Sequence, residues 1–584
     1  MKCRMKRVAS LFLALALCAG MTMNVGAVTV QEAENKADEL EGKKEQAEAE
    51  AKDLTEKLKG IVADMEETQK KLTEKEEEIE QVENELVQAQ IDANDQYERM
   101  KVRIKYMYES GNTQFVAVLA ESKNMGDFLN KAEYISQISE YDRDELIRYQ
   151  DTVEEIEVKE EEVQAEYDYP PMSDQLRGLG IELYEGYGEE QLSIHPDLWV
   201  IGNAISRGNP LLEAILNAGE PYTSGPQWIS EHILQGRHVM AVAGTHGKTT
   251  TSSVLAWILE ACGKAPGYLI GGVPSNFSHS ARLSPESPYF VIEGDEYDTC
   301  FFDKRSKFVH YRPRTAILNN LEYDHADIFE NVEAIEKSFH HLVRTMAQKA
   351  LIVANGQSAT LDRVLEMGCW SRVERFDSEN GWTISEDGEV AFRGESFGIL
   401  KSPLLGRHNQ LNTLAAIAAA RDAGVDPREA IAAMESFSGV KRRLEVKGTE
   451  DGVTVIDDFA HHPTAIRETI AALRGKIGYG KGRLIAVLEP RSNTMKMGTM
   501  RAALPGSLSD ADQVFCYAGA GVRWNEAEAL APLGDKAHTY TDLDLLVKEA
   551  AAYAAPGDSI LVMSNGGFGG VHGKLLAALR EKAS

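Results

Sequence analysis

The stretch His238-Val-Met-Ala-Val-Ala-Gly-Thr-His-Gly-Lys-Thr-Thr-Thr251 decides the fold of the second half of this chain. An apolar run ends in a glycine turn, and a helical pattern follows at once from Ser252 to Leu259. A strand, a glycine turn and a helix in this order form a phosphate cradle, because the N–H groups of the turn and the positive end of the helix face the anion. The stretch therefore predicts a nucleotide site.

The glycine turn carries the side chains that a nucleotide site needs. Lys248 would reach the outer phosphates and Thr249 would ligate Mg²⁺. The turn departs from the usual G-x-x-x-x-G-K-[ST] pattern, because Val242 stands five positions before Gly247. A glycine turn with a chance Lys-Thr pair is the alternative, and the flanking strand and helix patterns argue against it. The residues expected to hold the nucleotide are Gly244, Thr245, His246, Gly247, Lys248, Thr249 and Thr250.

The negative charge of the chain is concentrated ahead of this stretch. The 584 residues carry a net charge of −30, and the segment from Gln31 to Asp168 holds 40 acidic against 18 basic residues. An acidic chain argues against nucleic acid as a partner. The six cysteines lie far apart without metal spacing or a disulfide framework, and the last four fit a reducing compartment.

Residues 1–27 are predicted to be a secretory signal peptide. Four basic residues precede an apolar run over 8–19, and small residues suited to cleavage follow at Val25-Gly-Ala27. The apolar run is short for a transmembrane helix. No later segment is long and apolar enough to cross a bilayer, so we expect no stable membrane span.

Residues 28–167 are predicted to form a coiled coil. No proline occurs before Pro170. Apolar residues keep a heptad register, with polar gaps, at Leu54, Leu58, Ile61, Met65, Leu72, Ile79, Val82 and Leu86. A single charged helix is the weaker alternative, and the heptads would allow self-association. Tyr106-Met-Tyr-Glu-Ser-Gly111 and Phe115-Val-Ala-Val-Leu-Ala120 resemble the exported coiled-coil region of Gram-positive cell-wall hydrolases.

The composition changes abruptly after Asp168. Glutamate-rich heptads give way to Tyr169-Pro-Pro-Met172 and then to alternating strand and helix patterns. Apolar runs that predict strands begin at Ile181, Asp197, His238, Tyr289, Thr315, Ala350, Val453, Leu484, Gln513 and Ser559. This alternation favours an α/β fold with mostly parallel, doubly wound sheets. We expect three parts, at residues 168–235, 236–438 and 439–584.

Two acidic motifs follow predicted strands downstream of the phosphate turn. They are Glu293-Gly-Asp-Glu-Tyr-Asp298 and Asn319-Asn-Leu-Glu-Tyr-Asp-His325. Parallel-sheet proteins keep their sites at the carboxyl ends of strands, and carboxylates beside a triphosphate suit Mg²⁺. The first motif alone would fit a solvated acidic loop, but the two together favour a functional site.

Three further motifs carry groups suited to a nucleotide. In Gly406-Arg-His-Asn-Gln-Leu-Asn412, Asn409 or Asn412 could hydrogen-bond a purine edge, and a helix cap is the alternative. The guanidinium groups of Lys441-Arg-Arg443 suit a transferring phosphoryl group. In Asp457-Asp-Phe-Ala-His-His-Pro463, either aspartate could take ribose hydroxyls. The two histidines have no partner ligands at metal spacing, which argues against a metal site there.

Together these motifs resemble those of the Mur ligase family, from about Tyr169 to Ser584. Four stretches are most similar to the branch that reuses murein tripeptides: Gly202-Asn-Ala-Ile-Ser-Arg-Gly-Asn-Pro210, Pro221-Tyr-Thr-Ser-Gly-Pro-Gln-Trp228, Glu489-Pro-Arg-Ser-Asn-Thr-Met-Lys496 and Ser564-Asn-Gly-Gly-Phe-Gly-Gly-Val-His572. The resemblance implies an ATP- and Mg²⁺-dependent ligase that joins UDP-N-acetylmuramate to L-alanyl-γ-D-glutamyl-meso-diaminopimelate through an acyl phosphate. Such chemistry belongs in the cytoplasm, which conflicts with the signal peptide.

The resemblance also implies a role for each motif. The expected catalytic residues are Lys248, Glu293, His325 and Arg443. The expected metal ligands are Thr249 and Glu293 for one Mg²⁺ and His325 for a second. Asn412 would lie near adenine and Asp457 near ribose. Ser206, Arg207 and Asn209 would face the UDP-sugar, and Arg491, Ser492 and Asn493 would face the tripeptide, because a guanidinium suits a carboxylate.

One part of the family pattern has no counterpart here. The family opens with a strand and a glycine-rich loop that holds the UDP pyrophosphate, whereas only coiled-coil sequence precedes Tyr169. The strand expected at Ile181 would lack a neighbour, so residues 169–235 should be weakly stable. We expect Mg-ATP binding with poor ligation, from a reading frame that joins parts of two unrelated genes.

Two other functions compete with the ligase. One is a secreted coiled-coil wall protein that carries an inactive ligase part, which the signal peptide favours. The other is a ligase of the folylpolyglutamate type, which Asn565-Gly-Gly-Phe-Gly-Gly570 argues against.

Overall fold

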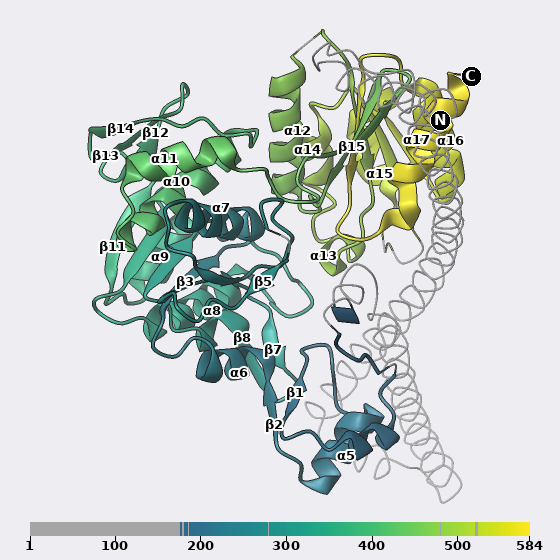
Figure 1. The fold of residues 1–584 in the computed structure, drawn as a ribbon. Helices are drawn as coiled ribbons and strands as arrows, with labels where there is room; N and C mark the ends of the chain where they lie inside the picture. Colours follow the sequence, from purple (N-terminus) through teal and green to yellow (C-terminus); the bar gives the residue numbers. More distant parts are fainter. Residues whose placement is uncertain are drawn as a thin grey trace, which may run out of the picture. The chain divides into compact units, whose positions relative to one another are not determined.

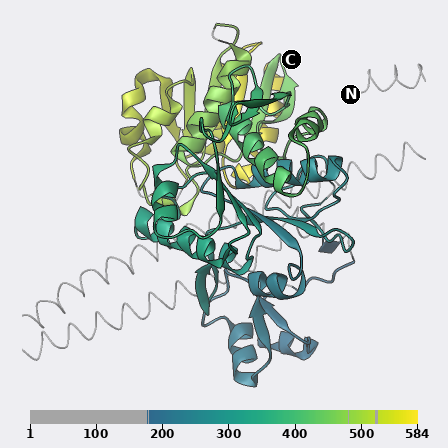
Figure 2. The ribbon, with the colours of Figure 1, turned by 90° about the vertical axis from the view of Figure 1, so that its left-hand side faces the viewer.

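The computed structural model describes residues 176–177, 180–184, 186–277, 279–478, 480–519, 522 and 524–583. The signal peptide predicted at 1–27 and the coiled coil predicted at 28–167 lie outside these ranges. Within them, no helix is both long and apolar enough to cross a membrane. Figures 1 and 2 show the described residues as a coloured ribbon.

Residues 186–235 build a small unit around two parallel strands. Its elements are η1 (Glu189–Ile194), β1 (Trp199–Ile201), α5 (Pro210–Ala218), β2 (Tyr222–Ser224) and α6 (Gly225–His232). In both ribbon views β1, β2 and α5 form a small blue lobe (Figures 1 and 2). Four buried residues make its core: Ile201, Leu211, Leu212 and Ile215. This core is small for a unit of 50 residues, which must also offset the conformational entropy of folding.

The strand predicted at Ile181 does not form. Residues 181–184 pair with no strand of the described chain, and Ile181 and Tyr184 are 47% and 52% exposed. An isolated strand leaves its backbone N–H and C=O groups without ladder partners, so this short apolar run stays irregular. The predicted strand was therefore wrong, although its expected lack of a neighbour explains why.

Residues 236–438 contain a ten-stranded, mostly parallel sheet with the order β14-β13-β12-β11-β10-β9-β3-β6-β4-β5. Its strands are β3 (His238–Ala243), β4 (Gly267–Leu269), β5 (Ala281–Arg282), β6 (Tyr289–Gly294), β9 (Thr315–Leu318), β10 (Leu351–Asn355), β11 (Arg372–Phe376), β12 (Trp382–Ile384), β13 (Glu389–Phe392) and β14 (Glu395–Ile399). A separate hairpin joins β7 (Asp298–Cys300) to β8 (Asp303–Ser306). Since β3 lies between β9 and β6 and runs parallel to both, the carboxyl ends of these three strands meet.

Helices cover both faces of this sheet, and each face has its own apolar core. One face carries α7 (Lys248–Ala261), α10 (Arg407–Asp422), α11 (Pro427–Ala433) and η3 (Met434–Ser436). The other carries η2 (Lys307–His310), α8 (Val332–Thr345) and α9 (Ala359–Glu366). Figure 1 shows α7 beside α10, in agreement with their many close contacts. Because α7 is enclosed by the sheet and α10, nearly all its side chains from Thr250 to Leu259 are buried.

Residues 439–584 contain a six-stranded sheet with the order β15-β16-β20-β17-β18-β19. Its strands are β15 (Glu445–Glu450), β16 (Val453–Asp458), β17 (Leu484–Leu488), β18 (Gln513–Tyr517), β19 (Ala537–Tyr540) and β20 (Ser559–Met563), of which β15 alone is antiparallel to its neighbour. Cores on its two faces involve α12 (Pro463–Ile477), α14 (Leu504–Leu508) and α15 (Glu526–Leu530), and α16 (Leu543–Tyr553) and α17 (Val571–Lys582) (Figure 1). The remaining helices are α13 (Asn493–Lys496), η4 (Ala531–Lys536) and η5 (Phe568–Gly570).

The α/β fold with mostly parallel sheets is confirmed. Predicted strands correspond to β1, β3, β6, β9, β10, β16, β17, β18 and β20. The edge strands β2, β5, β14, β15 and β19, the short strands β4, β12 and β13, and the hairpin strands β7 and β8 were not predicted. Nor was β11, whose sequence Arg-Val-Glu-Arg-Phe breaks the apolar run expected of a buried parallel strand.

Candidate active site

The phosphate turn lies between β3 and α7, as predicted, and its two glycines are required by space and backbone. Gly244 has φ 149° and Gly247 has φ 79°. A Cβ on Gly244 would lie 3.0 Å from the Asn319 Cβ, and a Cβ on Gly247 would lie 2.7 Å from Asn412 Oδ1. Neither position therefore accepts a side chain without a shift of its neighbours.

Two asparagines at the end of β9 hold the turn. The backbone N–H of His246 donates to Asn320 Oδ1 (2.8 Å), and Asn320 Nδ2 donates to the carbonyl of His246 (3.2 Å). Asn319 Nδ2 donates to Thr251 Oγ1 (2.8 Å) at the start of α7. The motif at residues 319–325 contains both asparagines, but the sequence did not predict that they hold the turn. That role depends on β9 lying beside β3.

Thr249 and Glu293 come together as the sequence predicted. Thr249 Oγ1 donates to Glu293 Oε1 (3.0 Å), and the other carboxylate oxygen accepts the N–H of Gly271 (2.8 Å). Burial raises the pKa of Glu293 above its usual value, although the nearby ammonium of Lys248 opposes the shift. A hydroxyl beside a carboxylate is a hard-oxygen donor set, so these residues fit Mg²⁺.

Lys248 and His325 meet on a carboxylate that received no role from the sequence. Glu296 is 2% exposed, and its two oxygens accept from Lys248 Nζ at 2.7 and 2.9 Å. His325 Nε2 lies 3.1 Å from Glu296 Oε1. Burial alone would lower the pKa of Lys248 and of His325, but Glu296 raises both. Of the expected metal ligands, His325 thus lies with Glu296, while Thr249 lies with Glu293.

A cavity of about 550 Å³ opens beside the turn. It joins motifs that lie far apart in the sequence. The lining includes His246, Gly247, Thr250, Asn319, Asn320, Asn409, Asn412, Arg443 and Asp458. The cavity is therefore the candidate nucleotide site, because the phosphate turn forms part of its wall.

Asn412 lies against the phosphate turn. It is buried in α10, its Oδ1 accepts from Asn319 Nδ2 (3.2 Å), and its Nδ2 donates to Asn409 Oδ1 (3.2 Å). These contacts connect α10 to the end of β9. The contact with a purine expected for Asn412 remains a prediction.

Of the two neighbouring aspartates, Asp458 lines the cavity and Asp457 does not. Asp457 Oδ2 lies 3.3 Å from Arg442 Nε, and its Oδ1 lies 3.2 Å from His572 Nε2. Successive side chains of β16 point to opposite faces of the sheet. The ribose contact expected of Asp457 remains a prediction. Burial raises the pKa of Asp458.

Arg442 and Arg443, which follow Gly439, make different contacts. Arg443 lines the cavity, with its guanidinium 5.3 Å from the Phe459 ring centre. Arg442 instead donates from Nη2 to the carbonyls of Ser564 (2.9 Å) and Gly566 (2.7 Å). Arg442 thus fastens the loop after β20, and Arg443 stays at the site.

The residues expected to face the UDP-sugar do not line this cavity. Arg207 Nε donates to Glu213 Oε1 (2.7 Å), and Asn209 Oδ1 accepts the N–H of Leu212 (3.0 Å) as the cap of α5. Ser206 accepts the N–H of Asn209 at its carbonyl (3.4 Å). All three residues lie at the start of α5, where these contacts stabilise the helix.

The residues expected to face the tripeptide follow β17. Ser492 Oγ accepts the N–H of Met495 (3.3 Å), and Asn493 is the first residue of α13. Arg491 lies against Gly566, where a Cβ would come within 2.4 Å of its side chain. Arg491 and the loop after β20 thus share one end of the C-terminal sheet.

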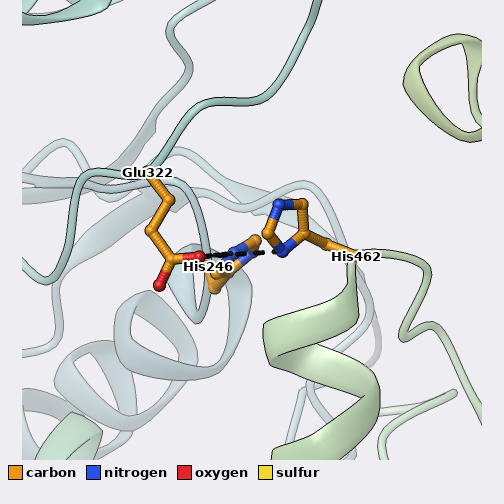
Figure 3. Close-up of side chains that lie close together, drawn as sticks. All are labelled: His246, Glu322 and His462. Atoms are coloured by element: carbon orange, nitrogen blue, oxygen red, sulfur yellow. Dashed lines mark ion pairs between the residues drawn. The ribbon is translucent and has the colours of Figure 1, made fainter. Parts of the chain in front are cut away.

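Three side chains from separate segments form a further cluster, which we call the Glu322 cluster: His246, Glu322 and His462 (Figure 3). His246 Nε2 lies 3.5 Å and His462 Nδ1 3.7 Å from Glu322 Oε2. The same oxygen accepts from Thr464 Oγ1 (2.6 Å). Sequence spacing had argued against metal ligands beside the double histidine; the fold supplies a histidine and a glutamate from two distant loops.

Four family models match the chain. The Mur ligase family, catalytic domain, matches residues 167–237, the Mur ligase middle domain matches 242–420, and the Mur ligase, glutamate ligase domain, matches 442–566. The coiled-coil domain of peptidoglycan hydrolase PcsB matches residues 85–159, which supports the resemblance of the N-terminal half to such proteins.

Named relatives agree with these models. The chain is 54% identical over 421 residues to the UDP-N-acetylmuramate–L-alanyl-γ-D-glutamyl-meso-2,6-diaminoheptandioate ligase of Escherichia coli, covering 71% of this chain and 92% of the relative. The Haemophilus influenzae protein of that name is 48% identical over 420 residues, with the same coverage. A crystal structure of a murein peptide ligase from Psychrobacter arcticus has a TM-score of 0.55 and 43% identity, covering 70% of this chain and 92% of that one. This chain belongs to the Mur ligase family.

Proposed function

We propose that the chain is an ATP-dependent ligase that joins the carboxylate of UDP-N-acetylmuramate to the amine of L-alanyl-γ-D-glutamyl-meso-diaminopimelate. The observation that carries this proposal is the phosphate turn, whose Lys248 donates to Glu296 and whose Thr249 donates to Glu293. The names of the relatives from Escherichia coli and Haemophilus influenzae support this choice of substrates.

The reaction has two steps. The carboxylate oxygen attacks the γ-phosphorus of ATP, so that an acyl phosphate forms and ADP leaves. The peptide amine then attacks the acyl carbon, phosphate leaves, and the amine loses a proton as the amide forms. Because anions must meet in the first step, positioning and charge neutralisation carry the rate.

The charges at the turn suit the first step. Lys248 is held between Glu296 and the turn, and it would move from Glu296 to the outer phosphates when the nucleotide binds. Arg443 would reach the γ-phosphate from across the cavity. Thr249 and Glu293 would hold Mg²⁺, which screens the triphosphate, and His325 with Glu296 would support a second ion.

The remaining wall of the cavity would hold the nucleoside. Asn409 and Asn412 suit the adenine edge, and Asp457, or Asp458 which lines the cavity, would take the ribose hydroxyls. On the peptide side, Arg491 would pair with a substrate carboxylate. We assign Ser206, Arg207 and Asn209 to the UDP-sugar, and the small core around them predicts weak binding of that substrate.

The N-terminal half is proposed to be an exported coiled coil behind a signal peptide at residues 1–27. The match of residues 85–159 to a hydrolase coiled-coil model supports this part of the proposal. Ligase chemistry needs ATP and a UDP-sugar, so we propose that it takes place in the cytoplasm. This conflicts with the signal peptide, because a chain that is exported would not meet these substrates. Fractionation of cells that express the tagged chain tests the location, since ligase activity confined to an exported fraction would contradict it.

The proposed activity is tested by ligation with the full-length protein. Product formation from UDP-N-acetylmuramate, the tripeptide and Mg-ATP is followed by mass spectrometry. Glu293→Gln should lower the rate by about 10²-fold or more, because it removes charge at the metal pair. The exposed Glu435→Gln serves as the matched control. Product at equal rates from both variants, or no product from the unaltered protein, would overturn the proposal.

A further inference from the structure

The Glu322 cluster brings together donor atoms from three parts of the fold. His246 belongs to the phosphate turn, Glu322 to the loop after β9, and His462 to the residue that caps α12. One ligand atom from each residue lies within 4.8 Å of the others. Figure 3 shows the two rings and the carboxylate directed toward one another.

The spacing of these atoms suits a tetrahedral cation. With metal–donor bonds of about 2.1 Å, neighbouring ligands of a tetrahedral ion lie about 3.4 Å apart. The two nitrogen–oxygen separations in the cluster are 3.5 and 3.7 Å. The two nitrogens lie within 4.8 Å of each other, so binding needs the histidine rings to move toward a common centre.

The histidines also have unmet polar atoms. His246 Nε2 is buried without a hydrogen-bond partner among the described residues, since 3.5 Å is too long for such a bond. His462 is 6% exposed, and its Nε2 also has no partner within the described chain, but the nitrogen that faces Glu322 is Nδ1. Buried polar atoms in native proteins are normally satisfied, so the unpartnered His246 Nε2 points to a ligand.

The charges of the cluster favour a cation as that ligand. Burial lowers the pKa of His462 to about 4, so this imidazole is neutral at pH 7. Burial would raise the pKa of Glu322, but His246, Thr464 and His462 lower it to about 2. A neutral imidazole and a carboxylate are the forms that bind a metal ion without first losing protons.

We propose that His246, Glu322 and His462 bind one divalent cation of the zinc class. Two imidazoles and one carboxylate suit Zn²⁺, whereas Mg²⁺ prefers oxygen ligands. The site shares no residue with Thr249, Glu293, Glu296 or His325. Three protein ligands leave a fourth position for water or substrate, and His246 and Glu322 both line the nucleotide cavity.

A cation here would join the phosphate turn to the C-terminal part of the chain. His246 and Glu322 belong to residues 236–438, and His462 precedes α12. One present contact opposes binding, because His462 Nδ1 accepts the N–H of Thr464 (3.3 Å) and coordination would take that lone pair. Thr464 would keep its hydroxyl bond to Glu322, but coordination would remove the side-chain cap of α12.

The proposal is tested by metal binding to the full-length protein, freed of any polyhistidine tag and stripped with a chelator. Co²⁺ is the optical probe, and Zn²⁺ competition gives the affinity. The expected result is one equivalent of Co²⁺ with the visible spectrum of a four-coordinate nitrogen–oxygen site, without thiolate charge-transfer bands. Glu322→Gln and His462→Gln should each raise the dissociation constant by about 100-fold. His538→Gln, an exposed imidazole on β19, should leave it unchanged.

Three results would overturn the proposal. They are the absence of a four-coordinate spectrum in the unaltered protein, thiolate bands in that spectrum, and equal affinity in Glu322→Gln and the unaltered protein. Glu322→Gln keeps the size of the side chain, so it remains informative where His462→Gln fails to fold. Circular dichroism and a thermal melt without metal check the fold of each variant. None of these readouts depends on ligase activity.

Discussion

The sheet around β3 and the pair β1–β2 show how differently two neighbouring parts of this chain are built. β3 lies inside a ten-stranded sheet with a core on each face, and its Val239–Ala243 segment is fully buried. β1 has one partner, β2, and its Val200 is 51% exposed. The nucleotide side is therefore well supported, whereas the side proposed for the UDP-sugar rests on four buried residues.

This difference bears on function because a binding site needs a rigid support. The phosphate turn is fixed by Asn319, Asn320 and α10, all of which belong to the large sheet or its helices. The residues Arg207 and Asn209 are fixed mainly within the first turn of α5. We therefore expect the nucleotide site to be much more stable than the site proposed for the UDP-sugar.

The largest expected effect is on hydrogen exchange. Backbone amides of β3 should exchange at least about 10³-fold more slowly than those of β1, because local stability rises with buried contacts and with paired neighbours. Exchange of the full-length protein, followed by peptide mass spectrometry, measures both strands in one sample. Equal protection of β1 and β3 would remove the contrast on which this account rests.

A pair of cavity-forming substitutions sharpens the same contrast. Leu255→Ala in α7 should lower the unfolding free energy of residues 236–438 by about 2–5 kcal/mol, because Leu255 is fully buried in the large core. Leu212→Ala in α5 removes an equally buried side chain from the small core. It should leave the urea transition read at β3 unchanged. A matching shift of that transition in Leu212→Ala would show that the two parts unfold as one.

Much of this contrast could be predicted from the sequence, and the reason is physical. Buried parallel strands such as β3, β6 and β17 are almost continuous apolar runs, so they are visible without a structure. The phosphate turn followed from such a strand and its motif, whereas the pairing of Thr249 with Glu293 and the missing partner of Ile181 followed from the family resemblance. Strand β12 and its hairpin neighbours are short and mix polar with apolar residues, so they were missed.

Other features needed the fold itself. The choice between Asp457 and Asp458 depends on which face of β16 each occupies. Glu296 could be read as part of an acidic motif, but its contacts with Lys248 and His325 cross three segments. The Glu322 cluster gathers residues at positions 246, 322 and 462, and no spacing rule signals such a site.

Removal of the Thr249 hydroxyl tests the proposed Mg²⁺ ligands Thr249 and Glu293, which lie beside the large sheet around β3. Thr249→Ala should raise the Mg²⁺ concentration needed for half-maximal nucleotide binding by about 10- to 100-fold, because it deletes an oxygen ligand. Thr249→Ser keeps the oxygen that contacts Glu293 and should restore binding. Calorimetry at a series of Mg²⁺ concentrations measures the shift. Equal Mg²⁺ dependence in the alanine and serine variants would contradict the assignment.

The smallest expected effect concerns acid stability. Asp558 is buried, and although burial opposes the shift, Arg483 and backbone N–H donors lower its pKa below the ordinary 3.8. Its stabilising contribution is therefore present above about pH 4 and is lost as the pH falls through the folded value. Between pH 5 and pH 3 the unfolding free energy of Asp558→Asn should fall by about 1 kcal/mol less than that of the unaltered protein.

The exposed ion pair Arg207–Glu213, in the small unit of residues 186–235, provides the comparison for Asp558. Arg207 lowers the pKa of Glu213 as well, but this pair lies in solvent, where such contacts contribute little. Glu213→Gln should therefore leave the acid branch of a urea-stability profile unchanged. A larger change in Glu213→Gln than in Asp558→Asn would contradict the expected ranking of these two ion pairs.

The central claim is that Lys248 and its turn grip the tail of a nucleotide, and one titration tests it most directly. Mg-ATP is titrated by calorimetry into the full-length protein and into Lys248→Met, with the exposed Lys401→Met as control. We predict one saturable site, weakened by roughly 10- to 100-fold in Lys248→Met because a charged hydrogen bond to phosphate is lost. Unchanged affinity in Lys248→Met would contradict the account.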